Sequence, residues 1–347
     1  MPEDSIDHID FEVLNKQAIS KPLVSHIYTA DPSAHVFNGK LYIYPSHDID
    51  AGEAFDDLGS HFAMEDYHVL SMEHPGGETT DHGQALHVND VPWAERQMWA
   101  PDAAEKDGKY YLFFPAKDYD GIFRIGVAVS DSPTGPFTPQ PKPIEGSFSI
   151  DPAVYKDDDG SYYIYFGGIW GGQLQRWCTG AFNGNQPESP LAFLPADNEP
   201  ALCAKVAKLS DDLLSLAEPV KDVVIVDEDG QALLQGDNDR RFFEASWVHK
   251  YKGNYYFTYS TGDTHFICYA IGDNPYGPFT YKGVILNPVV GWTSHHSIVE
   301  FEGKWYLFYH DSSLSKGVTH LRSVKVRELT HNEDGTIQAI NPYNEKI

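Results

Sequence analysis

Residues 31–48 read DPSAHVFNGKLYIYPSHD, a polar start, a first strand, a turn containing Gly39 and a second, aromatic strand. A tight hairpin turn needs a positive φ, which glycine adopts without steric cost. Four later stretches repeat this arrangement, and they read APDAAEKDGKYYLFFPAKD from Ala100, DPAVYKDDDGSYYIYFGG from Asp151, EASWVHKYKGNYYFTYSTG from Glu244 and HHSIVEFEGKWYLFYHDSS from His295. The chain is therefore predicted to contain five copies of one hairpin-based unit.

The second strand of each copy is a continuous apolar run, such as YYLFF, YYIYF or KWYLFY. Such runs indicate strands covered on both faces, which the neighbouring sheets of a propeller provide. Two further stretches, VAVSDSPTGPFT at 127–138 and YAIGDNPYGPFT at 269–280, share a turn pattern that adds a third and a fourth strand. We expect an all-β, five-bladed β-propeller with four-stranded antiparallel blades around a central channel.

The spacing of the turn glycines suggests where the extra chain lies. Gly39, Gly108, Gly160, Gly253 and Gly303 are 69, 52, 93 and 50 residues apart, so the bare unit is about 50 residues long. The excess falls at 49–66 and 171–240, and insertions of this kind usually surround one opening of the channel. In the second insertion, KVAKLSDDLLSLAEPV is expected to form strands rather than a short helix. We predict one domain over 1–347, with blades at about 30–95, 98–146, 149–225, 242–287 and 292–342.

The composition excludes several classes of partner. A net charge of −26 and a pI near 4.8 disfavour nucleic acids and anionic membranes, because both require a basic surface. The N-terminal MPEDSIDHIDFEV has no signal-peptide pattern, and no run of 18 apolar residues occurs, so a cytoplasmic location is expected. Three scattered cysteines give neither a disulfide framework nor a CxxC site. They are Cys178, Cys203 and Cys268.

The first position of each copy carries the chemistry. In order, these residues are Asp31, Ala100, Asp151, Glu244 and His295. The innermost strands of a propeller line its channel, so equivalent positions should converge on the axis. Three carboxylates in one funnel repel one another and raise at least one pKa. One protonated and one ionised carboxyl are what glycoside hydrolysis needs, and the apolar FFEASW surroundings of Glu244 favour it as the protonated one.

These residues and motifs resemble glycoside hydrolase family 43, propeller enzymes that act on xylan and arabinan side chains and oligomers. The resemblance extends from about Ala30 to Ile340 and rests on ADPSAHVFNGKLYIYPSHD, WAPD, SIDPAV, FFEASW and HHSIVEF. It implies that Asp31 is the general base, Glu244 the general acid, and Asp151 the residue that sets the pKa and orientation of the acid. It also implies inversion of the anomeric centre in one displacement.

The resemblance suggests further site residues. Trp99, in WAPD, would be the aromatic wall for a pentose ring, or else a core tryptophan between blades. Arg322 would hold substrate hydroxyls near the catalytic acids, and Trp170 is a further candidate for substrate binding. One of His295 and His296 would bind a calcium ion on the propeller axis, with sodium or no metal as alternatives. His47, His82 and His87 lack the HExxH spacing of a zinc protease and are expected to be rim or structural residues.

We therefore expect an exo-acting glycosidase that releases terminal β-1,4-linked xylose from xylooligosaccharides, α-L-arabinofuranosyl groups from arabinoxylan-derived oligosaccharides, or both. The alternatives are an α-1,5-L-arabinan hydrolase and a non-catalytic sugar-binding propeller. A retaining fructoside hydrolase is disfavoured, because Ala30-Asp31-Pro32-Ser33 and Ile150 stand where those enzymes carry a different nucleophile motif and an arginine. Some xylosidases of this family close the pocket with a C-terminal β-sandwich. Here, loops of the propeller or another subunit would have to close it, so a monomer and a homo-oligomer are both alternatives.

Overall fold

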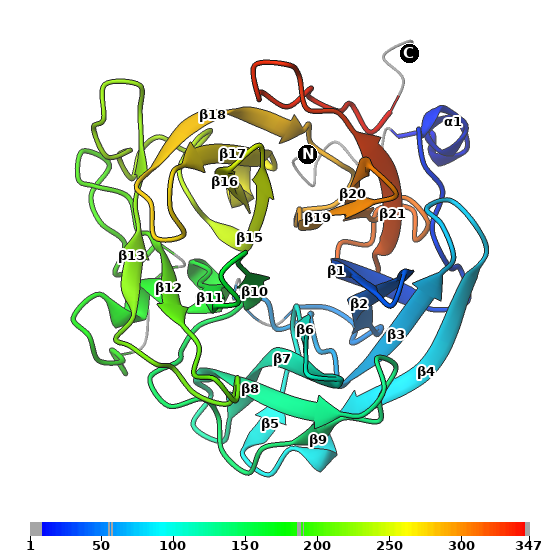
Figure 1. Cartoon of the computed structure of the whole chain (residues 1–347), viewed down its shortest axis with the longest axis horizontal. Coiled ribbons are helices and arrows are strands. Elements are labelled where there is room, and N and C mark those ends of the chain that lie inside the picture. The colour runs from blue at the N-terminus through cyan, green and yellow to red at the C-terminus, as the bar shows by residue number, and fades with distance from the viewer. Residues whose placement is uncertain (1–8, 55, 57, 186–188, 190, 344–347) are drawn as a thin grey trace.

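A computed structural model describes residues 9–54, 56, 58–185, 189 and 191–343. Five β-sheets surround a central channel, as Figure 1 shows, so the predicted five-bladed propeller is confirmed. The residues before position 9, on which much of the prediction about export rests, and part of the insertion sequence NQPESP lie outside the described residues. Among the helices of the described ranges, none has both the length and the apolar character needed to cross a membrane.

The blades follow one another along the chain. Blade one contains β1 (Tyr28–Phe37), β2 (Lys40–Asp48), β3 (Asp66–Met72) and β4 (Thr79–His87). Blade two contains β5 (Ala94–Arg96), β6 (Asp102–Lys106), β7 (Lys109–Asp118), β8 (Phe123–Ser130) and β9 (Thr138–Pro139). Its innermost strand is divided, because β5 and β6 both pair with β7. Blade three contains β10 (Ala153–Lys156), β11 (Tyr162–Phe166), β12 (Ala204–Lys208) and β13 (Lys221–Val223).

The last two blades depart from four antiparallel strands. Blade four contains β15 (Glu244–Tyr251), β16 (Asn254–Ser260), β17 (Ile267–Gly272) and β18 (Phe279–Leu286), with β14 (Ile225–Val226) parallel to β18 as a fifth strand. Blade five contains three described strands, β19 (His296–Phe301), β20 (Lys304–Asp311) and β21 (Ser323–Leu329). The helices are α1 (Phe11–Gln17) and short 3₁₀ segments at Val88–Asp90, Trp170–Gly172, Leu174–Trp177 and Gly262–Thr264.

The repeat glycines have the predicted geometry. All five turn glycines, Gly39, Gly108, Gly160, Gly253 and Gly303, have φ between 75° and 83°. Any other residue at these positions would have to adopt a backbone conformation that L-residues rarely adopt. In KVAKLSDDLLSLAEPV, residues 205–220, the first four residues belong to β12, no helix forms, and β13 begins directly after the last residue.

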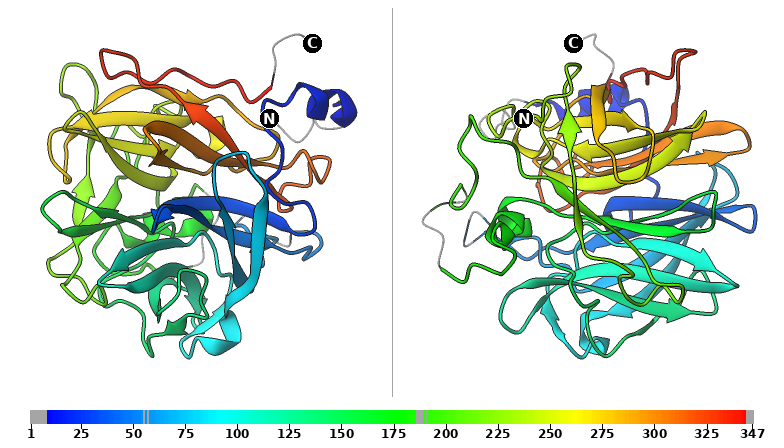
Figure 2. Two further views of the ribbon diagram at one scale, coloured as in Figure 1. Left: turned by 45° about the vertical axis from the view of Figure 1, so that its right-hand side comes forward. Right: turned by 60° about the vertical axis from the view of Figure 1, so that its left-hand side comes forward.

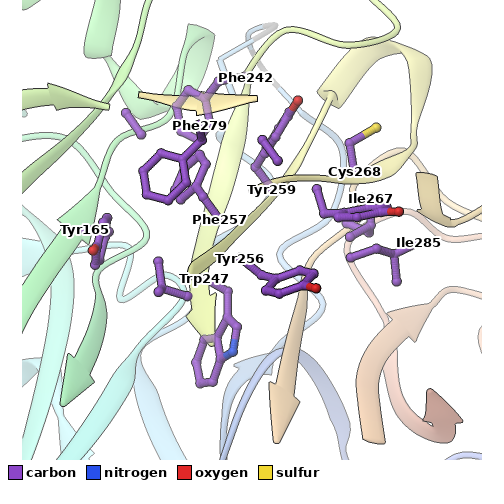
Figure 3. Close-up of a cluster of buried hydrophobic side chains, with 14 of the residues drawn as sticks. Tyr165, Phe242, Trp247, Tyr256, Phe257, Tyr259, Ile267, Cys268, Phe279 and Ile285 are labelled. Atoms are coloured by element: carbon purple, nitrogen blue, oxygen red, sulfur yellow. The ribbon is translucent and has the colours of Figure 1, made fainter. Parts of the chain in front are cut away.

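Aromatic side chains fill the spaces between blades. Figure 3 shows the cluster around blade four, in which Phe257 lies between Tyr165 of blade three and Phe279 of its own blade. The indole N–H of Trp247 donates to the carbonyl oxygen of Ile298 at 2.9 Å and so joins blades four and five. Each fully buried aromatic side chain of this kind stabilises the fold by about 1.5–3 kcal/mol.

The ring is closed by the N-terminal segment, which the sequence did not indicate. Residues 19–29 run beside β21, where Leu23 N–H donates to Val324 O at 2.8 Å and Thr29 N–H donates to Arg322 O at 2.9 Å. In Figures 1 and 2, α1 accordingly lies at the outer edge next to blade five. The first segment of the chain thus completes the edge of the last blade, which has only three strands of its own among the described residues.

A buried ion pair stabilises blade five near this seam. Lys325 Nζ lies 2.7 Å from Asp311 Oδ2, and both side chains are at most 1% exposed. The hydroxyl of Tyr343, from the C-terminal segment, donates to the same carboxylate oxygen at 2.7 Å. The carboxylate therefore joins β20, β21 and the end of the described chain.

We predict that Lys325→Met lowers the free energy of unfolding by about 3–5 kcal/mol, because it leaves the charge of Asp311 buried without a cation. Urea unfolding of the purified protein measures the loss. The matched control is Lys304→Met, which removes an ion pair with Glu328 whose side chains are 59% and 51% exposed, and whose loss should cost about 1 kcal/mol or less. Equal effects of the two substitutions would contradict the prediction.

Candidate active site

A cavity of about 760 Å³ opens at one end of the channel. Its wall contains seven of the eight residues that the sequence singled out, and His296 is the exception. The seven are Asp31, Trp99, Asp151, Trp170, Glu244, His295 and Arg322. The first insertion also contributes to the wall, through Ala54, Asp56, Leu58, Gly59, His61, Phe62 and Met64. Of the described residues of the second insertion, Gly171 and Gly172 line the cavity.

The innermost strands begin with an irregular backbone that carries the acids. Asp31 and Asp151 have φ values of 49° and 56°, in the left-handed region. In blade four the positive φ, 63°, belongs to Ala245, so Glu244 lies one residue before the position that the two aspartates occupy. The ladders of β1 and β15 shift register at these points. Equivalent irregularities in three blades thus bring three carboxyl groups into one cavity.

Asp31 lies in a cationic and hydrogen-bonded setting. Its Oδ1 accepts from Arg322 Nη1 at 2.9 Å and its Oδ2 accepts from Ser46 Oγ at 2.7 Å. Burial would raise the pKa of Asp31, but Arg322, with smaller contributions from neighbouring imidazoles and Ser46, lowers it to about 2. This carboxylate is therefore ionised at neutral pH.

Arg322 is itself held by Asp48, a residue that the sequence analysis missed. Its Nε donates to Asp48 Oδ2 at 2.8 Å and its Nη2 to Asp48 Oδ1 at 2.7 Å, while its backbone N–H reaches Oδ2 at 2.9 Å. Both side chains are at most 3% exposed. A two-point bond of this kind fixes the guanidinium plane, and Nη1 is thereby aimed at Asp31.

Within the described ranges, no cationic side chain donates a hydrogen bond to Glu244 or Asp151. Burial and the negative charge of Asp31 raise the pKa of Glu244 to about 8. Burial and the charges of Glu244 and Asp31 raise the pKa of Asp151 well above its usual value. The charge of Glu244 therefore disfavours ionisation of Asp151, and the pair retains a proton at neutral pH. Asp151 Oδ2 also accepts from the backbone N–H of Ala245 at 2.9 Å, directly after Glu244.

Of the two adjacent histidines, His295 faces the cavity. Its Nδ1 lies 3.6 Å from Asp31 Oδ1 and 3.9 Å from Asp151 Oδ2, and burial lowers its pKa to about 4, so the ring is neutral at pH 7. His296 instead bonds Thr258 Oγ1 through Nε2 at 2.6 Å inside the protein. A neutral imidazole beside two carboxyl groups is a suitable donor set for a cation, with water supplying further oxygen ligands.

Tryptophans form the side walls of the cavity. The indole N–H of Trp99 donates to Phe62 O at 2.8 Å, and its ring lies 4.6 Å from that of Phe123. Trp170 lies 5.4 Å from Trp292, a third cavity tryptophan that the sequence analysis did not single out. Trp292 lies three residues before the HHSIVEF motif and outside the repeats, so no pattern in the sequence pointed to it.

Comparison with known proteins agrees with this geometry. A family model described as "Glycosyl hydrolases family 43" matches residues 19–337. A xylosidase/arabinosidase of Bacteroides ovatus is 60% identical over 93% of this chain and 98% of its own length. Two crystal structures also resemble the chain.

The first is a β-xylosidase/α-arabinofuranosidase from a compost microbial metagenome, solved with xylotriose in a calcium-free form. It is 69% identical, with a TM-score of 0.91 over 94% of this chain and 98% of that one. The second is an enzyme of Xanthomonas citri solved with xylotriose. It is 60% identical, with a TM-score of 0.90 over 97% of this chain and 98% of that one.

The raised pKa of Glu244 predicts a pH-dependent stability. A carboxyl whose pKa is higher in the folded than in the unfolded protein stabilises the fold most below the unfolded value, near 4.5, and this stabilisation is lost as the pH rises to about 8. Glu244→Gln should therefore become more stable relative to the parent by up to about 1.4 kcal/mol per pH unit in this window. Urea unfolding between pH 5 and 8 measures the difference. The exposed Glu328→Gln serves as the control, and a difference that does not change with pH would contradict the prediction.

Proposed function

The chain belongs to glycosyl hydrolases family 43, and from this we propose that it is a β-xylosidase/α-L-arabinofuranosidase acting on xylooligosaccharides. It would release terminal β-1,4-linked xylose, and α-L-arabinofuranosyl groups from arabinoxylan-derived oligosaccharides. Relatives of at least 60% identity with these two activities, and relatives solved with bound xylotriose, support the substrate class. The observation that carries the proposal is a cavity holding one ionised and one protonated carboxyl group.

We propose Asp31 as the general base. An ionised carboxylate can remove a proton from water as that water attacks the anomeric carbon. The bonds from Arg322 and Ser46 keep the carboxylate ionised and fix its orientation. Its low pKa makes it a weak base, which suits a transition state in which the sugar ring carries most of the positive charge and the water needs little activation.

Glu244 is the proposed general acid. With a pKa of about 8 it is protonated at neutral pH and can give its proton to the departing glycosidic oxygen. We propose that Asp151 tunes and orients this acid. A negative charge on Asp151 would disfavour ionisation of Glu244, and the bond that Asp151 accepts from the N–H of Ala245 holds the backbone that carries Glu244. Direct displacement by water with these roles inverts the anomeric centre.

The cavity walls support a role in binding sugar. The Trp99 ring is fixed by its bond to Phe62 O, so it can present a face to a pentose ring at little entropic cost. Trp170 lines the same cavity. Most N–H groups of Arg322 are bonded to Asp48 and Asp31. Nη2 carries two N–H groups, and among the described residues its one hydrogen-bond partner is Asp48, so the second N–H can bind a substrate hydroxyl.

We also propose that His295 binds a calcium ion. The existence of a related structure described as a calcium-free form, and the two carboxyl groups near the imidazole, support this. A bound cation would add positive charge beside the acids. His295, Asp31 and Asp151 are the residues in position to face it.

The acid role of Glu244 predicts a dependence on the leaving group. Glu244→Gln should lower kcat on xylobiose by about 10²–10⁴-fold, because an alkoxide departs poorly without a proton. The loss should be much smaller on p-nitrophenyl β-xyloside, whose phenolate departs unaided. Asp31→Asn should lower kcat on both substrates by similar factors. ¹H NMR of the parent reaction measures the rate on xylobiose. On p-nitrophenyl β-xyloside, where the released sugar is the one product with an anomeric centre, it should show α-xylose first. Equal losses on the two substrates for Glu244→Gln, or β-xylose as the first product, would refute the assigned roles.

Calcium binding at His295 predicts a metal-dependent stability. Calcium added to chelator-treated protein should raise Tm, since an ion that binds only the folded state stabilises it by RT ln(1 + [L]/Kd). The shift should disappear in His295→Ala, which removes the ligand, and persist in the buried control His296→Ala, because His296 bonds Thr258 rather than facing the cavity. Differential scanning calorimetry measures the shift. A calcium response in His295→Ala equal to that of the parent would contradict the assignment.

A further inference from the structure

Three metal-binding side chains gather on the face of blade one. The β2–β3 ladder pairs Leu41–Ile43 with Leu70–Met72, with Ile43 opposite Leu70. Continuing this register by four residues places His47 opposite Asp66. Because side chains alternate between the faces of a strand, His68 lies on the same face as Asp66.

The distances within this group are those of potential ligands. His47 Nδ1 lies 2.6 Å from Asp66 Oδ1, and His68 Nε2 lies 3.7 Å from Asp66 Oδ2. One ligand atom from each of the three residues lies within 4.8 Å of the other two, and in the described part of the chain no other three His, Cys, Asp or Glu residues were found so close together. A transition ion binds at about 2.0–2.2 Å from nitrogen and oxygen ligands, which small side-chain rotations would allow here.

A second carboxylate orients His68. Its Nδ1 donates to Asp81 Oδ1 at 2.9 Å, so in the neutral ring the lone pair of Nε2 is directed toward Asp66. Asp81 is held in turn by the N–H of Gly83 at 2.8 Å and by His26 Nε2 at 2.7 Å. A histidine that binds a metal ion in a protein usually donates one ring N–H to a carboxylate and binds the ion through the other nitrogen.

The group stands at the base of the loop that forms one wall of the cavity. Residues 49–65 connect β2 to β3, so His47 precedes this connection closely and Asp66 follows it directly. The connection supplies cavity residues that include His61 and Phe62. None of the three clustered residues lines the cavity itself. An ion held by them would therefore join the two ends of the loop without entering the catalytic centre.

We propose that His47, Asp66 and His68 form a binding site for a divalent transition metal ion, such as Zn²⁺, that clamps the base of the loop 49–65. Two imidazoles and one carboxylate favour zinc, nickel, cobalt or copper ions over calcium and magnesium, which prefer oxygen ligands. The two imidazole rings are 4.5 Å apart between centroids, close enough to share one ion. The site is separate from the cavity and does not depend on the activity proposed above.

The test is a Zn²⁺ titration of the chelator-treated full-length protein by isothermal calorimetry. Loss of a residue that only hydrogen-bonds a metal ligand typically raises the Kd about 10–100-fold, and Asp81→Asn should fall in that range. His47→Gln and His68→Gln each remove a ligand and should raise the Kd by more. The matched control is His82→Gln, a histidine of the neighbouring β4 whose Nε2 lies 2.7 Å from Ser71 Oγ, outside the group. It should leave the Kd unchanged. Hydrogen exchange in the segment 49–65 should slow when Zn²⁺ is added to the parent.

Two further measurements separate this site from others and from misfolded variants. His295→Gln should keep the zinc affinity if the ion binds at blade one, and a loss of binding in that variant alone would overturn the proposal. Anomalous diffraction at the zinc edge from zinc-soaked crystals of the parent needs no variant, and it should give a peak between His47, Asp66 and His68. Absence of that peak, or no zinc binding by the parent, would also overturn the proposal.

Discussion

The buried contact of Arg322 with Asp48 and Asp31 is the interaction on which the site depends. The guanidinium belongs to the residue just before β21 of blade five, and both carboxylates come from blade one. Removing one member would leave a buried charge without its partner, which costs several kcal/mol. The same backbone supplies the closure of the ring, because the carbonyl oxygen of Arg322 accepts from Thr29 N–H. The seam of the propeller and the electrostatics of the cavity are therefore determined together.

This single cation divides three similar carboxyl groups into two classes. Asp31 and Asp151 are buried and Glu244 is half-buried, and the removal of water around them would by itself raise all three pKa values. Asp31 touches Arg322 and stays ionised, whereas Glu244 and Asp151 accept no bond from a cationic side chain among the described residues. The negative charge that Arg322 secures on Asp31 then raises the pKa of Glu244. One ion pair thus keeps Asp31 ionised and, through the charge of Asp31, favours the protonated form of Glu244.

The sequence predicted the features that repeat, and the family resemblance added Trp99, Trp170 and Arg322, but the ring closure and Asp48 were missed. Five turn glycines and five aromatic strands recur, so the blades and the convergence of Asp31, Asp151 and Glu244 followed from the pattern. Ring closure occurs once and joins Leu23 to Val324, two residues with no local signal and nearly the whole chain between them. Asp48 looked like any polar residue at a strand end. Its role becomes visible only in the structure, where it is buried because it pairs with Arg322, 274 positions away.

The offset of Glu244 shows why an inexact repeat serves this site. If Glu244 occupied the position equivalent to Asp31, Glu244 itself would have to adopt the left-handed backbone conformation. Ala245 adopts it instead, with φ of 63°, at a cost on the order of 1 kcal/mol for a residue without a side-chain hydrogen bond to compensate. The N–H of Ala245 meets Asp151 Oδ2 at 2.9 Å in this conformation. The local strain is therefore offset by a bond to a carboxyl group, and that bond fixes Asp151 and the backbone of Glu244 relative to each other. One peptide N–H therefore holds Asp151 and Glu244, which come from different blades, in a fixed relative position. Direct contact between two negatively charged side chains would instead push them apart.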